Sequence, residues 1–309
     1  MNKIIEVERL SKSFGKVLAV NDISFYVEEG SLFSFLGTNG AGKSTTISIM
    51  LTLLKQNEGK VKINGFTVGK QDDKIRQEIG VVFQDSLLDP LLTVEENLNV
   101  RGSFYGMSKN EKHEAVKRVI AVTDLASFID RPYGKLSGGE RRRTDIARAL
   151  IHNPTVLIMD EPTTGLDSYN RKSIWKTILQ LQKETKMTVF LTTHYIEEAA
   201  NSDYVVVMNE GQIVAKGTPE QLKNNYASDS LLMTTSHVET MKDRLNADQL
   251  EFKEVKSIFE LPLADTTDAI PILAKFADLL TSCEVRKSSL DDVFLAITGK
   301  AVADNDRIN

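Results

Sequence analysis

The residues best suited to chemistry form a glycine-rich stretch that begins at Gly37. It reads Gly37, Thr38, Asn39, Gly40, Ala41, Gly42, Lys43, Ser44, followed by Thr45, and matches the phosphate-binding loop pattern. An apolar run precedes it and a helical pattern follows, which is the context that such a loop requires. Backbone N–H groups, a helix N-terminus, the Lys43 ammonium and the Ser44 hydroxyl would act on one polyanion and its Mg²⁺. The stretch therefore predicts a polyphosphate site.

Two carboxylates follow a second apolar run. The sequence Val156–Met159 predicts a buried strand, and Asp160 and Glu161 come directly after it. Open α/β sheets hold ligands at the carboxyl ends of their strands. There Asp160 would hold the metal through a water, and Glu161 would accept a proton from an attacking water. In isolation, simple solvation of a strand end would be the better explanation of two acids, but the upstream loop favours the catalytic interpretation.

A third segment runs from Leu136 to Glu140. Ser137 and Glu140 have the spacing of a capping box, so the segment could merely begin a helix. The adjacent Gly138 and Gly139 cost that helix about 2 kcal/mol relative to alanine, which is a poor choice unless a ligand approaches the backbone closely. We therefore expect a second anion site here, and a solvated helix face at Arg141–Arg143.

The elements that must position these residues predict an α/β fold. Residues 1–30 alternate between apolar and polar types, as in antiparallel strands, and four short apolar runs predict a mostly parallel core sheet. These runs are 32–36, 79–83, 155–159 and 188–192, with a helix over 168–184 between the last two. Residues 85–153 have a helical period with capping boxes at Thr93 and Ser108, and 204–215 predict a hairpin.

The predicted fold is thus a P-loop NTPase core with an N-terminal antiparallel β-subdomain and a helical insert. This nucleotide-binding domain covers 1–225, with the helical subdomain at about 86–153. Residues 226–309 alternate strand and helix, with one strand expected over 251–261, and predict a small α+β accessory domain.

Composition excludes several classes of protein. The 309 residues carry a net charge of −5, the wrong sign for wrapping nucleic acid. The lone Cys283 cannot form an internal disulfide, and the acidic N-terminal stretch lacks the apolar block of a secretory signal, so a cytoplasmic compartment is expected. The apolar runs fall short of the roughly 18 residues that span a bilayer, so any membrane role would be peripheral.

An ordered series of motifs resembles the nucleotide-binding subunit of ATP-binding cassette (ABC) transporters over about residues 4–225. The series is Phe14, the phosphate loop, Gln84, LSGGE, MDEP, the Gly165-Leu166-Asp167 stretch and His194. The resemblance implies ATP and Mg²⁺ as cofactors, with Phe14 stacked on adenine, Gln84 near the metal and the attacking water, and His194 at the γ-phosphate. Two departures are Phe14, where the family more often has Tyr, and Glu140, where it usually has Gln. The other histidines, His113, His152 and His237, are interpreted as structural.

The same resemblance implies an ATP-dependent homodimer. Each chain has one phosphate loop and one LSGGE segment, and in the family these face different nucleotides. Ser137, Gly138, Gly139 and Asp167 would then complete the partner's site in a head-to-tail pair, and hydrolysis would separate the pair. The helical insert, from Thr93 to about Asp130, would dock on an integral-membrane permease at the inner face of the cell membrane.

The segment 288–299 resembles the end of exporter-type ATPase subunits of the drug-efflux kind, which favours export. A regulatory or dimer-supporting role and a simple packing role remain open for it. Two alternatives to a transport ATPase are a soluble cassette protein acting on ribosomes or DNA, and a GTPase. The first usually has two cassettes or a long coiled-coil insert, and the second needs an Asn-Lys-x-Asp segment; neither feature is present in this sequence. The transported substrate cannot be read from it.

Overall fold

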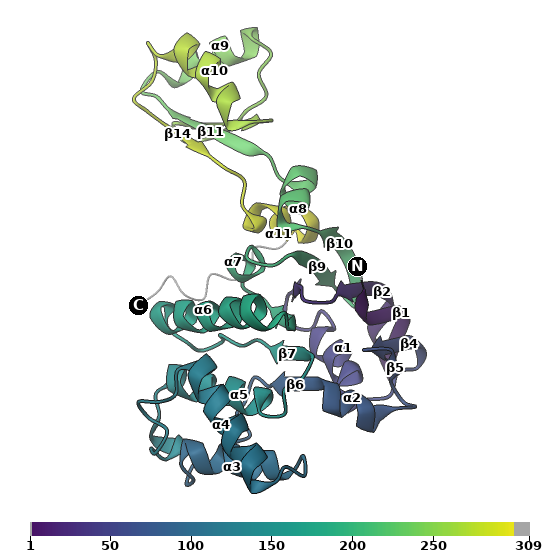
Figure 1. Ribbon diagram of the computed structural model, residues 1–309. Helices are drawn as coiled ribbons and strands as arrows, with labels where there is room; N and C mark the ends of the chain where they lie inside the picture. The colour runs from purple at the N-terminus through teal and green to yellow at the C-terminus, as the bar shows by residue number, and fades with distance from the viewer. Residues whose placement is uncertain (1, 300–309) are drawn as a thin grey trace. The chain divides into compact units, whose positions relative to one another are not determined.

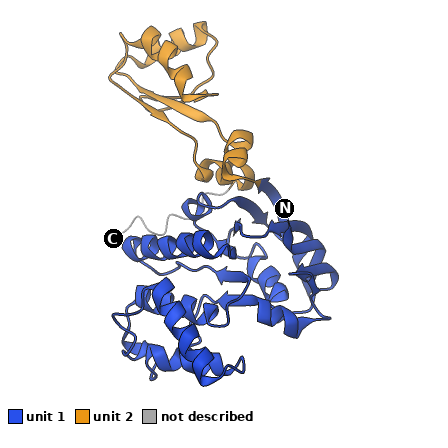
Figure 2. Ribbon diagram, in the orientation of Figure 1, with its two compact units in different colours: residues 1–216 blue, residues 217–309 orange. Residues whose placement is uncertain are grey.

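The computed structural model describes residues 2–299, which form two compact units that divide between Lys216 and Gly217 (Figure 2). The first unit contains two sheets and the helices around them, and the second contains a third sheet (Figure 1). The expected α/β fold with an antiparallel N-terminal subdomain is confirmed. The predicted boundary between the nucleotide-binding domain (1–225) and the accessory domain (226–309) stays a prediction. So do the predicted limits of the helical subdomain.

The core sheet has six strands in the order β10-β9-β3-β8-β7-β6. Strands β3, β6, β7, β8 and β9 pair in parallel, and β10 returns beside β9 as the predicted hairpin. Their apolar runs are buried because helices and the second sheet cover both faces. The bounds are β3 (Leu32–Gly37), β6 (Ile79–Val82), β7 (Val156–Asp160), β8 (Thr188–Thr193), β9 (Tyr204–Asn209) and β10 (Gln212–Gly217).

The crossovers between these strands are helical. They are α1 (Lys43–Met50), α2 (Asp72–Glu78), α6 (Ser168–Thr185) and α7 (Ile196–Ala199). Helix α6 joins β7 to β8 and buries the face that contains Ile174, Trp175, Ile178 and Leu181. Since each parallel strand is followed by a loop at the same edge of the sheet, the ends of β3, β7 and β8 can share one site.

The N-terminal sheet is antiparallel, in the order β2-β1-β4-β5. It consists of β1 (Lys3–Phe14), β2 (Val17–Glu28), β4 (Glu58–Ile63) and β5 (Phe66–Thr67). The rings of Phe25, Phe33 and Phe190 stack between this sheet and the core sheet, with centroids 5.2–6.2 Å apart. Strands β4 and β5 were not predicted, although Asn64-Gly65 between them is the strongest short-range hairpin signal.

The helical insert contains α3 (Val94–Ser103), α4 (Lys109–Thr123), a 3₁₀ turn η1 (Tyr133–Lys135) and α5 (Gly138–Leu150). Each of the three α-helices begins with a capping box, at Thr93, Ser108 and Ser137, as the sequence predicted. Their apolar faces form one core with α6 and the adjacent face of the core sheet. The insert is therefore held firmly against the strands that carry the candidate catalytic residues.

The second unit packs helices on a four-stranded sheet in the order β12-β13-β11-β14. The predicted single strand over 251–261 is wrong, because the chain turns at Lys256, where φ is 59°, and forms two strands. Helices α8 and α11 contact each other within this unit, and Pro219 is the first residue of α8, as predicted. The bounds are α8 (Pro219–Tyr226), β11 (Asp229–Thr234), α9 (Val238–Ala247), β12 (Lys253–Val255), β13 (Ile258–Leu263), η2 (Thr266–Asp268), α10 (Ala269–Phe276), β14 (Ser282–Arg286) and α11 (Leu290–Thr298).

Candidate functional site

The glycine-rich loop lies between β3 and α1, as predicted. Gly42 precedes the helix with φ of 101°, and a Cβ atom placed on it would lie 2.4 Å from the Ala19 carbonyl oxygen. Only glycine fits here, because both the backbone conformation and the close approach of β2 exclude a side chain. Asn39, Gly40 and Ser44 are exposed, so the concave side of the loop is open to a ligand.

Lys43 is the buried cation of this loop. Its side chain is 4% exposed, and Nζ donates to the carbonyl oxygens of Gly37 at 2.7 Å and Thr38 at 3.1 Å. Burial lowers the pKa of Lys43, while the nearby Glu161 and Asp160 carboxylates oppose that shift. Nζ lies 3.8 Å from Glu161 Oε1. The ammonium therefore connects the loop after β3 with the loop after β7.

Glu161 is held in a defined position by contacts from three directions. Its backbone has φ of 46°, and its N–H donates to the carbonyl oxygen of Thr192 at 3.2 Å. Oε2 accepts a hydrogen bond from Thr164 Oγ1 at 3.1 Å and lies 3.2 Å from His194 Nδ1. His194 is the main cause that lowers the pKa of Glu161, and Lys43 adds to it. The carboxylate is thus ionised and aimed at the glycine-rich loop.

Asp160 has a different environment from its neighbour. Oδ1 accepts a hydrogen bond from Thr192 Oγ1 at 2.5 Å, and burial raises the pKa of the carboxyl. Thr192, on β8, also accepts from the Glu161 N–H through Oγ1 at 3.1 Å. One hydroxyl on β8 thereby orients both consecutive acids at the end of β7.

A buried carboxylate that the sequence analysis missed joins the two catalytic loops. Glu198, on α7, is 3% exposed and accepts hydrogen bonds from the hydroxyls of Thr163 and Thr193. Thr163 follows Glu161 by two residues, and Thr193 directly precedes His194. Glu198 therefore fixes the segments that carry the candidate base and the histidine. Its sequence signal is weak, because Glu197 beside it is exposed and the two acids look alike.

Gln84 follows β6, which pairs with β7 so that Val82 lies opposite Met159. This register places Gln84 on the same edge of the sheet as Asp160, and its side chain is exposed. The predicted solvated face at Arg141–Arg143 is wrong for Arg142, which is 6% exposed. It donates to the carbonyl oxygens of Phe83 at 2.6 Å and Gln84 at 3.1 Å. A charged residue on an amphipathic helix gives no sign in the sequence that it is buried.

Phe14 ends β1, and its ring is 49% exposed with Lys12 Nζ 5.2 Å from the centroid. The β1–β2 hairpin packs against the glycine-rich loop through Ala19 and Gly42. An exposed ring on this hairpin is available for stacking against a planar base.

The LSGGE segment lies apart from Lys43. Ser137 and Gly138 are exposed, and a Cβ atom on Gly139 would lie 2.1 Å from Asn170 Oδ1 at the start of α6. Asp167 is exposed and caps α6 through the Asn170 N–H at 2.8 Å. Within residues 2–299, no hydrogen bond or ion pair joins Ser137 or Asp167 to the group around Lys43. Each chain therefore presents two separate polar surfaces.

The donor set at the first surface suits Mg²⁺. Ser44 supplies a hydroxyl, Gln84 an amide oxygen and Asp160 a carboxylate, and Mg²⁺ is typically held by one or two carboxylates together with substrate phosphates. The described residues contain no group of three or more His, Cys, Asp or Glu side chains that could hold a metal without a substrate. The residues present thus fit a metal that arrives with a polyphosphate.

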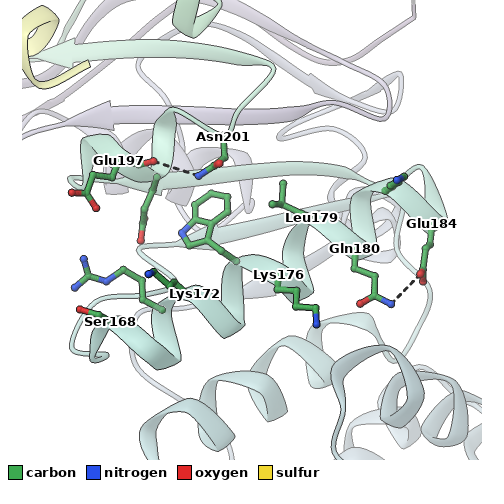
Figure 3. Close-up of a pocket in the computed structure, with 12 residues that line it drawn as sticks. Ser168, Lys172, Lys176, Leu179, Gln180, Glu184, Glu197 and Asn201 are labelled. Atoms are coloured by element: carbon green, nitrogen blue, oxygen red, sulfur yellow. Dashed lines mark hydrogen bonds between the residues drawn. The ribbon is translucent and has the colours of Figure 1, made fainter. Parts of the chain in front are cut away.

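A hollow of about 1020 Å³ lies along α6 and α7 (Figure 3). Lys172 and Lys176 lie along α6 in this view, and Glu197 and Asn201 lie across from them. None of Lys43, Asp160, Glu161 and His194 lines it, so it is distinct from the group around Lys43. His152 is structural, as expected: its ring stacks on Tyr105, and burial lowers its pKa to about 4.

None of the helices formed by residues 2–299 is both long and apolar enough to cross a bilayer.

Comparison with known proteins matches residues 20–164 to the family described as ABC transporter. The linearmycin resistance ATP-binding protein LnrL of Bacillus subtilis is 33% identical, over 97% of this chain and 100% of its own length. Nod factor export ATP-binding protein I of Burkholderia lata is 36% identical, over 97% and 98%. A dimeric ATP-binding cassette in a post-hydrolysis state with ADP and Pi is 30% identical with a TM-score of 0.62, over 69% and 98%.

Proposed function

Because the chain belongs to the ATP-binding proteins of ABC transporters, of the exporter type, we propose that it powers export through a separate membrane permease by hydrolysing ATP between two copies of itself. The observation that carries the proposal is the convergence of Lys43, Glu161 and His194 at one edge of the core sheet. A cation for phosphates, a base for water and a histidine within 3.2 Å of that base form a hydrolytic site.

Each side chain has a role that its surroundings support. Lys43 exchanges its two carbonyl partners for the β- and γ-phosphates, whose charge also offsets the cost of its burial. Glu161 accepts the proton of the attacking water, because its lowered pKa keeps it ionised at neutral pH. His194 holds Glu161 in position and reaches the γ-phosphate, and Phe14 stacks on adenine.

Ser44, Gln84 and Asp160 would hold Mg²⁺, with Asp160 acting through a water. When bound, the metal would neutralise charge on the β- and γ-phosphate oxygens. Gly37 to Thr45 surround the phosphates with N–H groups, and the α1 N-terminus favours negative charge there. The Thr192 hydroxyl holds the Asp160 carboxylate, whereas Thr164 and His194 hold that of Glu161, so one can serve the metal and the other the water.

The second surface completes the partner's site. Ser137, Gly138 and Gly139 at the start of α5, with Asp167 at the start of α6, are exposed or lie at an exposed helix end. In a head-to-tail pair, they close on the γ-phosphate held by the Lys43 loop of the other chain. ATP then joins the two chains, and its hydrolysis releases them.

The permease binds the helical insert at the inner face of the membrane. Large apolar side chains are exposed on this insert and just before it: Leu87 at 66%, Leu91 at 85% and Phe104 at 76%. Large apolar side chains that are left exposed are candidates for a protein interface. The names of the two relatives place them in linearmycin resistance and in Nod factor export. Selectivity for the substrate that this chain helps to export lies in the permease.

The test is an ATPase assay combined with affinity capture. The purified full-length chain should release ADP and phosphate from ATP with Mg²⁺, and capture from detergent-solubilised membranes should recover a polytopic membrane protein. Leu91→Asp with Phe104→Asp should abolish capture and leave ATP binding intact. Recovery of ribosomes or nucleic acid in place of a membrane protein would refute the transport assignment.

A further inference from the structure

A buried charged stripe crosses α5 and contacts the loop that carries Gln84. Arg142, Asp145 and Arg148 are spaced by three residues, so they lie on one face of the helix, and each is no more than 6% exposed. Arg142 donates to the carbonyl oxygens of Phe83 and Gln84, and Arg148 donates to that of Val81 at 2.5 Å. The stripe therefore holds the end of β6 directly to the helix that begins with the LSGGE segment.

Asp145 is the centre of this stripe and has two donors from different segments. Ser86 Oγ donates to its Oδ1 at 2.7 Å, and the Tyr133 hydroxyl lies 3.3 Å from both carboxylate oxygens. Burial together with the Asp145 charge raises the pKa of Tyr133 to about 12, so its hydroxyl keeps the proton that it donates. A single carboxylate thus joins the loop after Gln84 to the turn before Ser137.

These two segments are the ones that the proposed function places in different sites. Gln84 is the residue placed at the metal, and Ser86 follows it by two residues, directly before the exposed Leu87. Ser137 is the residue placed at the partner's nucleotide, and Tyr133 precedes it by four residues. The Tyr133 N–H donates to the Leu92 carbonyl oxygen at 2.9 Å. Burying a carboxylate and two guanidinium groups is costly, and core packing alone would be served better by apolar side chains.

Resting on the proposed function, we propose that Asp145 is a positioning residue that makes the Gln84 loop and the Ser137 segment move as one body. A displacement of Gln84 on nucleotide contact in one site then displaces the segment that completes the other site. Two of the exposed side chains that we assign to the permease, Leu87 and Leu91, lie between Ser86 and Leu92. Asp145 itself touches neither nucleotide nor metal, and it acts through Ser86 and Tyr133.

The experiment removes one donor at a time in the full-length chain. Tyr133→Phe and Ser86→Ala each delete a single hydroxyl, and hydrogen exchange is followed by mass spectrometry over residues 84–92 and 133–137. Each variant should raise exchange in the segment that it does not belong to, by about fivefold for the loss of one net hydrogen bond. Tyr105→Phe is the matched control, since it deletes a hydroxyl that accepts from Arg101 inside the insert. It should leave both segments unchanged.

The second readout is turnover. Each single variant should lower kcat about fivefold with the KM for ATP within about twofold, and the double variant should be no slower than either single one, because the two hydroxyls serve one carboxylate. Exchange that rises only in the mutated segment, or a double variant whose losses multiply, would overturn the inference. Absence of ATP hydrolysis in the unmodified chain would instead overturn the proposed function, and the exchange result would still decide this inference.

Discussion

Replacement of Glu161 by glutamine tests the catalytic base. The substitution keeps the size of the side chain and an oxygen that can accept from Thr164 Oγ1, now 3.1 Å from Oε2. It removes the group that takes the proton from water. Loss of a general base costs about 10² to 10⁴ in rate, or about 3 to 5 kcal/mol in the activation free energy. We expect kcat to fall by that factor.

Binding should respond differently from turnover. Glu161→Gln removes a negative charge 3.8 Å from Lys43 Nζ, where phosphates are to bind, so ATP affinity should be unchanged or higher. ATP-bound dimer should accumulate, because the step that separates the two chains is blocked. The assay is phosphate release under saturating ATP, with light scattering for the dimer. Glu197→Gln, the same change at an exposed neighbour on α7, is the control and should retain normal turnover. Near-normal turnover in Glu161→Gln would refute the assignment of the base.

Three further changes test other parts of the site. Lys43→Ala should weaken ATP binding about 10- to 100-fold by equilibrium dialysis, since it deletes charge-assisted hydrogen bonds to the phosphates; unchanged affinity would contradict its role. Glu198→Ala leaves the buried Thr163 hydroxyl without its acceptor and leaves Thr193 only the Tyr195 carbonyl oxygen at 3.4 Å. It should lower the free energy of unfolding by about 2 to 4 kcal/mol in urea, and a loss below about 0.5 kcal/mol would argue against the role of Glu198 in joining the two segments. His194→Ala removes the main cause of the lowered pKa of Glu161. The variant should therefore have a lower free energy of unfolding than the unmodified chain above the ordinary carboxyl pKa of 4.5, and this difference should vanish as the pH falls below that value. Urea unfolding across pH measures the difference, and a difference independent of pH would be inconsistent with the contact.

The phosphate loop and the acid pair could be predicted because their chemistry restricts the backbone. Gly42 needs a positive φ and room for Ala19, and Asp160 and Glu161 must follow a strand buried on both faces. Such requirements leave residue types and spacings that can be recognised without a structure. The same holds for the helix starts, where Thr93, Ser108 and Ser137 form capping boxes with a glutamate three residues later.

The supporting residues could not be predicted, for a physical reason. Segments distant in sequence bury Arg142, Asp145 and Glu198. The sequence pattern of an amphipathic helix is the same whether a charged side chain faces water or a protein carbonyl group. The turn at Lys256 also lacks a sequence signal, because Lys has little preference for the positive φ that the pairing of β12 with β13 requires there. The order of motifs therefore indicated where the site lies, whereas the buried residues that support it could be found only in the structure.

The central claim is that each nucleotide is held by the Lys43 loop of one chain and the Ser137 segment of the other. Mixing two inactive variants tests it, both in a Glu161→Gln background: one chain carries Lys43→Ala and the other Ser137→Arg. Only a mixed pair then has one intact site, made from the Lys43 loop of the second chain and the Ser137 segment of the first. We predict that either variant alone stays monomeric with ATP, whereas the mixture forms dimers that retain one ATP per pair. A mixture that binds and dimerises no better than its separate components would contradict the shared site.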